Sequence, residues 1–246
     1  LHHLPVLPTE DTLSYYVVYM CAHIKPDSVD SYLSGICNRL ENFFPNIRTI
    51  RTSMLVSRTL KGCKRLRGSE VHRKLPLSRD DIRRAIATLR PSLDHDDKLF
   101  LTLLVTGFNG LLRLAELSMP DTKKLRNWRK ITRRSTVEWV PLGYSFLLPA
   151  HKADVTFEGN RIIIPASDDA SINPSPIFHN YLVSRDERFP VHPGLWVTSA
   201  GKTPTRSWFI RRLRRLFPSR RIAGQSMRAG GATALASDGV LPHLIQ

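Results

Sequence analysis

Apolar residues recur at helical spacing through the first 67 positions of the chain. The clearest case starts at Pro26-Asp27-Ser28, and its apolar positions lie three or four residues apart: Val29, Leu33, Ile36 and Leu40. An earlier helix is predicted to begin at Thr9-Glu10-Asp11-Thr12 and to pass Cys21. Pro45 is expected to end the second helix, and residues 55–67 indicate a third. The pattern predicts a small helical domain over residues 1–67.

This periodicity stops at residues 68–77, which are polar, contain Pro76 and show no repeat. We expect an interdomain linker there. Ser78-Arg79-Asp80-Asp81 is a start signal for a further helix. Residues 97–119 are apolar over a long stretch, which predicts one or two buried helices broken near Gly107 or Gly110.

Residues 135–165 change period and are rich in β-forming side chains. Pro141-Leu142-Gly143 and Glu158-Gly159-Asn160 separate the apolar runs, which predicts a small antiparallel sheet. Helical spacing returns over residues 176–188, 205–217 and 226–237. The expected fold class is mainly α with a small antiparallel β-sheet, arranged as a helical domain over 1–67 and a larger domain over 78–246.

The charge of the chain narrows the choice of partner. Lysine and arginine number 37 against 21 aspartate and glutamate, a formal net charge of +16, which indicates a polyanion and above all nucleic acid. Cations gather over residues 123–134 and on the helix 205–217. The side chains expected to contact DNA phosphates are Lys61, Lys64, Arg65, Arg67, Lys124, Arg126, Arg206, Arg211, Arg212, Arg214 and Arg215. A solvated basic surface is the alternative interpretation.

The cysteine content and the hydropathy of the chain indicate which cellular compartment it occupies and whether it crosses a membrane. Cys21, Cys37 and Cys63 are widely spaced and odd in number, which fits neither a metal site nor a disulfide framework. We therefore expect a reducing compartment, nucleus or cytoplasm, and no metal. No run of about 18 apolar residues occurs, so no membrane span is expected. The first residues do not have the pattern of a signal peptide and do not start with Met, so we expect the chain to begin within a longer protein.

Arg113 and Glu116 stand out within the apolar stretch, because a helix would place them on one face. A buried guanidinium needs an acidic partner or an anionic ligand. A purely structural ion pair is one interpretation. The other is an arginine held rigidly so that its two-pronged donor group grips a phosphate.

Two later segments carry further candidate chemistry. Lys152, next to His151, precedes the last apolar run of the predicted sheet, where a lysine is ordinarily just solvated. Arg228 follows Ser226, a candidate N-cap that would leave backbone N–H groups near an anion. The small residues 229–232 would let another backbone approach closely.

Together these segments resemble the tyrosine recombinases, the phage integrase family of DNA breaking and rejoining enzymes. Residues 107–117 are similar to the first arginine box of the family, and 225–235 to the second; residues 147–154 match its β-hairpin lysine segment. The run Arg-Ala-Gly-Gly-Ala-Thr is most like the fungal crypton-type mobile-element recombinases. The resemblance covers a helical core-binding domain over 1–67 and a catalytic domain over 78–246.

The resemblance implies transesterification without a metal or any other cofactor. A tyrosine attacks the DNA phosphate while Arg113 and Arg228 bind it. Glu116 would buttress Arg113, and Lys152 would protonate the leaving 5′ oxygen, with His151 as the second candidate. Gln225 stands at the histidine position of the family, where it can donate a hydrogen bond but cannot shuttle a proton.

The family's nucleophile lies downstream of the second arginine box, whereas all six tyrosines of this chain lie upstream of Arg228. We therefore expect a C-terminally truncated recombinase and no nucleophile among these residues. The expected function is DNA binding, recombination and integration, incomplete in this chain; the alternative is a non-catalytic DNA-binding remnant of a mobile-element recombinase. The resemblance also implies protomers that assemble on double-stranded DNA. An RNA-binding protein would explain the charge but not the ordered Arg113, Lys152 and Arg228.

Overall fold

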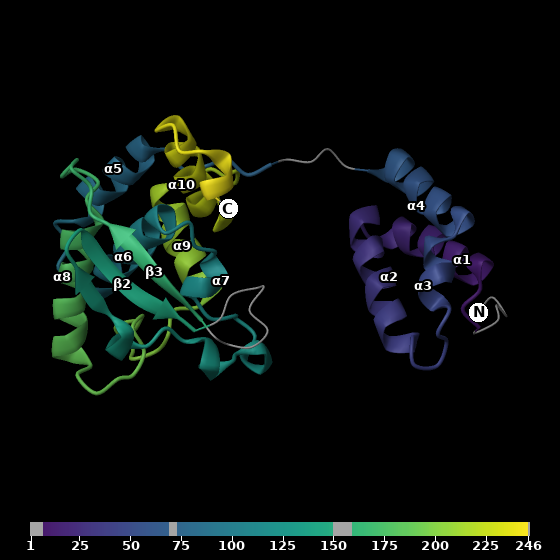
Figure 1. Cartoon of the computed structure of the whole chain (residues 1–246), viewed down its shortest axis with the longest axis horizontal. Helices are drawn as coiled ribbons and strands as arrows, with labels where there is room; N and C mark the ends of the chain where they lie inside the picture. The colour runs from purple at the N-terminus through teal and green to yellow at the C-terminus, as the bar shows by residue number, and fades with distance from the viewer. Residues whose placement is uncertain (1–6, 69–72, 150–158, 246) are drawn as a thin grey trace. The chain divides into compact units, whose positions relative to one another are not determined.

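The computed structural model describes residues 7–68, 73–149 and 159–245. The chain divides into two compact units, Leu1–His72 and Arg73–Gln246. Figure 1 shows the first as purely helical in its described part and the second as a mixture of helices and a small sheet. Within the described ranges, no helix combines the length and the apolar character that crossing a bilayer requires.

The helices of the first unit are α1 (Glu10–His23), α2 (Pro26–Leu40), α3 (Ile47–Thr52) and α4 (Met54–Arg67). The predicted starts are confirmed: the Thr9 hydroxyl accepts the backbone N–H of Thr12 at 3.1 Å, and Pro26 is the first residue of α2. One prediction was wrong: α2 ends at Leu40, before Pro45. The helix expected over residues 55–67 is confirmed as α4, which Ser53 caps, whereas the short helix α3 was not predicted.

The core of the first unit is a single apolar cluster from α1, α2 and α4. Its buried members are Leu13, Val17, Cys21, Val29, Leu33 and Val56. Their spacing of about four residues along α1 and α2 places them on one face of each helix. The basic last turn of α4, with Lys64, Arg65 and Arg67, is not part of this apolar cluster.

The helices of the second unit are α5 (Arg79–Leu89), α6 (His95–Asn109), α7 (Leu114–Leu117), α8 (Pro174–Arg188), α9 (Arg206–Leu216) and α10 (Gln225–Ser237). Short 3₁₀ turns lie at η1 (Lys123–Leu125), η2 (Trp128–Lys130), η3 (Arg134–Thr136) and η4 (Pro242–Leu244). Ser78 forms the predicted cap of α5, as a full capping box with Asp81. The break expected near Gly107 or Gly110 is confirmed, since α6 ends at Asn109 and Gly110 is its C-cap.

The sheet has three antiparallel strands in the order β1 (Glu138–Val140), β2 (Gly143–Leu148) and β3 (Asn160–Pro165). Tyr144 of β2 lies opposite Trp139 and Ile164 and is fully buried. Its ring stacks on Phe178 of α8 at 3.8 Å, and its hydroxyl is 2.8 Å from that of Thr106 on α6. One strand residue thus joins the sheet to both central helices, and the mainly α class with a small antiparallel sheet is confirmed.

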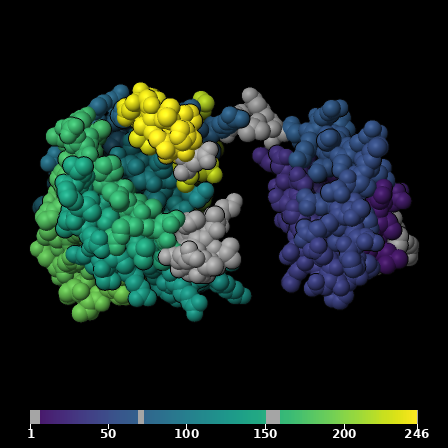
Figure 2. Space-filling view, viewed as in Figure 1, coloured from purple at the N-terminus to yellow at the C-terminus, as the bar shows by residue number. Residues whose placement is uncertain are grey.

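The predicted linker extends too far into the second unit. Leu77 is buried, and its N–H donates to the Ser226 carbonyl at 3.0 Å. The Leu75 N–H donates to the carbonyl of Arg221 at 2.9 Å. These bonds tie the residues before α5 to the start of α10. Residues after α10, yellow in Figure 2, lie on the surface of this unit, where Leu241 is 56% exposed.

Candidate functional site

The turn between α6 and α7 sets the position of Arg113. Leu111 has a φ of 50°, which is uncommon for a residue other than glycine, and the Leu112 N–H returns to the carbonyl of Gly107 at 3.0 Å. The chain then leaves α6, and Arg113 is the extended N-cap residue of α7. The prediction that Arg113 lies inside a helix was therefore wrong.

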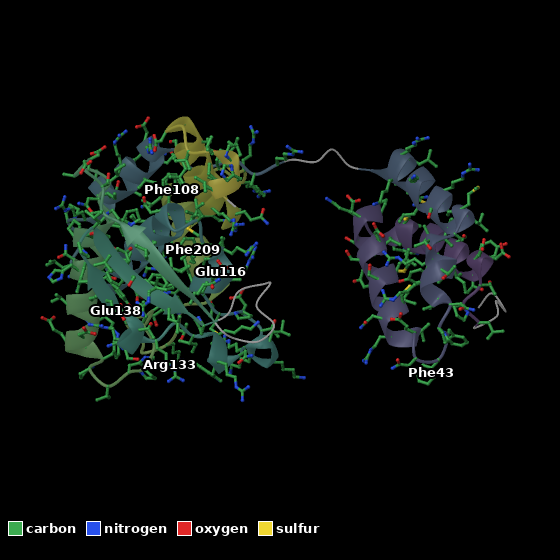
Figure 3. All side chains as sticks on the ribbon, viewed as in Figure 1. Phe43, Phe108, Glu116, Arg133, Glu138 and Phe209 are labelled. Carbon is green, nitrogen blue, oxygen red and sulfur yellow. The ribbon has the colours of Figure 1, made fainter. Side chains whose placement is uncertain are left out.

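Arg113 and Glu116 form a two-point contact. The backbone N–H of Arg113 donates to Glu116 Oε2 at 2.6 Å, and Arg113 Nη1 donates to Oε1 at 3.1 Å. The Glu116 side chain is only 9% exposed, whereas that of Arg113 is 46% exposed. The buried partner is thus the carboxylate, contrary to the sequence-based expectation of a buried guanidinium. Glu116 belongs to α7 and is labelled in Figure 3. Within the described ranges no other residue pairs with the remaining side-chain donors of Arg113, which can serve a ligand.

The start of α10 packs directly against the start of α7. A Cβ atom added to Gly224, the N-cap of α10, would lie 2.5 Å from Leu114 Cδ2. Leu114 follows Arg113 and Gly224 precedes Gln225, so this contact brings the two arginine-containing segments together. Ser226 is not the N-cap that the sequence suggested: it lies inside α10, and its hydroxyl accepts the Ala223 N–H at 2.9 Å.

The two glycines that follow Arg228 allow close backbone contacts, as predicted. A Cβ on Gly231 would lie 2.0 Å from the Phe108 carbonyl oxygen, and one on Gly230 would lie 2.1 Å from that of Leu77. No side chain larger than hydrogen fits at either position without a shift. α10 is therefore held against the end of α6, the region where Phe108 is labelled in Figure 3.

Arg228 is half-buried in the first turns of α10, and Gln225, the first residue of that helix, is exposed. Across the described ranges 7–68, 73–149 and 159–245, no hydrogen bond or ion pair engages the Arg228 side chain. Among these residues nothing occupies its five N–H donors, which suit an anion. Lys152 and His151 lie outside the described residues; β2 and β3 on either side of them pair from Gly143 to Leu148.

The arginines of α9 fall into two groups. Phe209 and Leu213 bury one face of the helix, as its periodicity predicted. Arg206, Arg211, Arg214 and Arg215 are exposed. Arg212 differs: it is 18% exposed, pairs with Asp97 at 2.6 Å and Asp96 at 3.2 Å, and stacks on Trp208. Arg212 is thus paired within the unit and is not a free, outward-facing cation, while its contact with DNA stays a prediction.

The other predicted DNA contacts are also unequal. Lys61, Arg65 and Lys124 are exposed. Lys64 is bound to Asp27 at 3.1 Å and Asp30 at 3.3 Å, so it is not a free cation. Arg67 is exposed but donates to the Cys21 carbonyl, and Arg126 donates to the carbonyls of Pro120 and Asp121.

The tyrosines of the second unit are both core residues. Tyr144 and Tyr181 are fully buried, and burial strongly raises the pKa of each phenol. The Tyr181 hydroxyl donates to the Leu195 carbonyl at 2.8 Å. Neither group can reach a DNA phosphate in this fold. The other four tyrosines belong to the first unit.

A pocket beside Glu116 was missed by the sequence analysis. It is lined by Glu116, Thr132, Trp196, Thr203 and further residues of four separate segments. No local spacing connects these positions, so no pattern in the sequence marks them. Metal-binding groups are a separate question: among the described residues, no three or more His, Cys, Asp or Glu side chains are grouped so that they could hold a metal ion.

The sequence matches no protein-family model and no curated protein. Its structure is similar to that of the Tn1549 transposon integrase in complex with circular-intermediate DNA, with a TM-score of 0.60 and 14% identity over 99% of this chain and 77% of that one. The same integrase with transposon right-end DNA gives 0.58 and 13%, over 99% and 78%. The XerH site-specific recombinase bound to its difH substrate gives 0.52 and 12%, over 100% and 91%. The chain therefore has the fold of the tyrosine recombinases.

Proposed function

We propose that this chain binds double-stranded DNA at a phosphate site built on Arg113 and Arg228, and that it serves DNA recombination or integration. The observation that carries the proposal is Arg228: a half-buried guanidinium without a partner among the described residues, on a helix packed against Leu114. A half-buried cation of this kind gains most from an anionic ligand. The fold, which is that of DNA-bound integrases, supports the same reading.

Each side chain has a role that its chemistry allows. Arg113 and Arg228 each present a planar fork of donors that suits phosphate oxygens, and Glu116 fixes the backbone and guanidinium of Arg113. Gln225 is exposed one turn before Arg228 and adds a neutral amide donor. Lys152 is assigned the protonation of the leaving 5′ oxygen in the tyrosine-recombinase transesterification. No metal or other cofactor enters this scheme.

The exposed cations extend the phosphate site into a duplex-binding surface. Lys124, Arg206, Arg211, Arg214 and Arg215 of the second unit are exposed, and Lys61 and Arg65 add positive charge in the first. Neutralising several phosphates makes binding steeply dependent on salt. Assembly of protomers on DNA and descent from a crypton-type mobile element belong to the same proposal.

A second candidate function is DNA binding without cleavage. Two observations favour it: Tyr144 and Tyr181 are buried in the core, and Gln225 cannot act as a general base. In this case the grip on the phosphate is retained while the covalent step is absent.

Binding of a fluorescent duplex of mixed sequence tests the phosphate site. Arg228→Ala should weaken binding about 10- to 150-fold, because charge-assisted hydrogen bonds contribute roughly 1.5–3 kcal/mol. Arg228→Lys should recover part of the loss, since it restores the charge without the fork. Arg83→Ala is the matched control: it removes the same charge from an arginine of this unit that is paired with Asp80 and Asp169. Equal affinity of Arg228→Ala and Arg83→Ala, or a preference for single-stranded RNA over duplex DNA, would refute the proposal.

A nicked duplex that traps the cleaved state distinguishes the two functions. A covalent protein–DNA adduct on a denaturing gel would establish cleavage by this chain. Tight, salt-sensitive binding without an adduct would establish the non-catalytic alternative.

A further inference from the structure

The pocket beside Glu116 has a volume of about 280 Å³ and lies between α7, the turns η1 and η2 and the chain before α9. This is close to the lower end of ordinary small-ligand pockets, roughly 300 Å³. Met119, Pro120 and Ile131 contribute apolar surface to its walls. Lys130 and Arg206 also line it and are both exposed, so they mark its solvent-facing rim.

Unpartnered polar atoms are concentrated around this pocket. Six buried side-chain N or O atoms lack a hydrogen-bond partner within the described residues, and three of the six belong to residues that line this pocket: Thr132 Oγ1, Trp196 Nε1 and Thr203 Oγ1. Thr132 and Trp196 are each only 2% exposed. Burying a donor without a partner is costly, so a group that supplies partners here is strongly favoured.

Glu116 supplies an acceptor at the same place. Each of its carboxylate oxygens already accepts one hydrogen bond from Arg113, and each has capacity for another. The residues that line the pocket therefore carry one indole donor, two hydroxyls and a carboxylate, beside the apolar surface of its walls. A hydrocarbon would leave these groups unpaired, and a simple anion placed inside would meet the carboxylate.

A nucleotide satisfies all of these features at once. A planar base fits between apolar walls and carries both acceptors and donors on its edge, and its phosphate would lie at the rim between Lys130 and Arg206. The exocyclic amine of cytosine, adenine or guanine can donate to Glu116, whereas thymine has no exocyclic amine and could donate only its ring N3–H. We propose that this pocket binds a nucleotide with an amino-bearing base.

The nucleotide has two sources with the same chemistry: one turned out of bound DNA, or one free in solution. The first source rests on the DNA binding proposed above, and the second does not. Because Glu116 also holds Arg113, a base in this pocket would contact the same carboxylate that positions the phosphate-binding arginine.

The indole N–H resonances of the ¹⁵N-labelled chain provide the test. The chain has four tryptophans, and the Trp196 signal is assigned by its loss in Trp196→Phe. Titration with dCMP, dAMP or dGMP should shift this signal, while the signal of Trp139, outside the pocket, stays in place; dTMP should bind more weakly. Thr203→Val, a variant of nearly equal shape, should weaken binding about tenfold through the lost hydrogen bond.

Duplex DNA with an unpaired 2-aminopurine provides the second arm. A Trp196 shift with a rise in 2-aminopurine fluorescence, without a response to free nucleotides, assigns the pocket to a base turned out of DNA. A response to free nucleotides in a chain that fails to bind duplex DNA would retain the pocket and refute the proposed function. An unmoved Trp196 signal in both arms, or an equal shift with inorganic phosphate alone, would overturn the nucleotide assignment.

Discussion

Arg185 and Arg228 are helical arginines of the same unit that differ in burial and in hydrogen bonding. Arg185 is 1% exposed; it donates to Asp186 at 2.8 Å and to the carbonyls of Phe189, His192 and Gly194. Arg228 is half-buried, and no residue in the described part of the chain pairs with it. The first guanidinium holds the segment after α8 in place, and the second has its donors free.

The comparison shows that spare hydrogen-bonding capacity, not basic charge, distinguishes a candidate phosphate ligand from a structural arginine. Arg113 is intermediate, since one carboxylate fixes it while nearly half of its side chain is exposed. Arg212 is a structural arginine like Arg185, because it forms ion pairs with Asp96 and Asp97. The formal net charge counts each of these arginines as +1, so it does not separate the internally paired arginines from those that can bind a phosphate.

The largest effect is expected from Arg185→Met. Removing the guanidinium leaves the carbonyls of Phe189, His192 and Gly194 without this donor, while Asp186 keeps its ion pair with Arg134. Each unpaired buried acceptor costs roughly 1–3 kcal/mol, so the free energy of unfolding should fall by about 3–5 kcal/mol. Urea unfolding followed by circular dichroism measures the change. Arg83→Met, at an exposed ion pair, is the control and should cost roughly 1 kcal/mol or less. Equal losses for the two variants would contradict the distinction between a buried, internally bonded arginine and an exposed one.

Gly231→Ala should have the next largest effect. The added methyl group would lie 2.0 Å from the Phe108 carbonyl oxygen, so α10 must move away from α6 at a cost of about 1–3 kcal/mol in stability. Because α10 carries Arg228, duplex affinity should fall as well. Gly35→Ala has open space around its Cβ on α2 and should be neutral or stabilising by roughly 0.5–1 kcal/mol. Unchanged stability in Gly231→Ala would show that the two backbones do not approach this closely.

The smallest effects separate two arginines of one helix. Arg214→Gln removes an exposed cation, so the slope of log K against log salt should decrease by about 0.9 while stability stays within roughly 0.5 kcal/mol. Arg212→Gln should leave the slope unchanged and cost about 1 kcal/mol of stability through its lost ion pairs. Fluorescence anisotropy over a salt series, with thermal unfolding alongside, measures both. If both variants reduce the slope equally, Arg212 contacts DNA despite its internal partners.

Local patterns predicted most of the elements correctly. Thr9, Pro26 and Ser78 start their helices because capping and a preset φ act within one turn of the chain. The apolar face of α9 follows from its 3.6-residue period. The glycines after Arg228 correctly predicted that another backbone lies close to α10. The Arg113–Glu116 contact also followed from a spacing of three residues. The short helix α3 was not predicted, because its six residues are too few to show a helical repeat of apolar positions.

The sequence by itself determined the helical and β segments, the basic charge and the two short-range arginine motifs, since each depends on residues within a few positions of one another. Only the tertiary structure decided which cations are free. Asp97 is far from Arg212 in sequence, and the carbonyl of Gly194 reaches Arg185 only across a folded loop. The same holds for Trp196, Thr132 and Thr203, which meet around one pocket because the core brings their segments together. Burial and pairing are long-range properties of the fold, and the chemistry of an arginine depends on both.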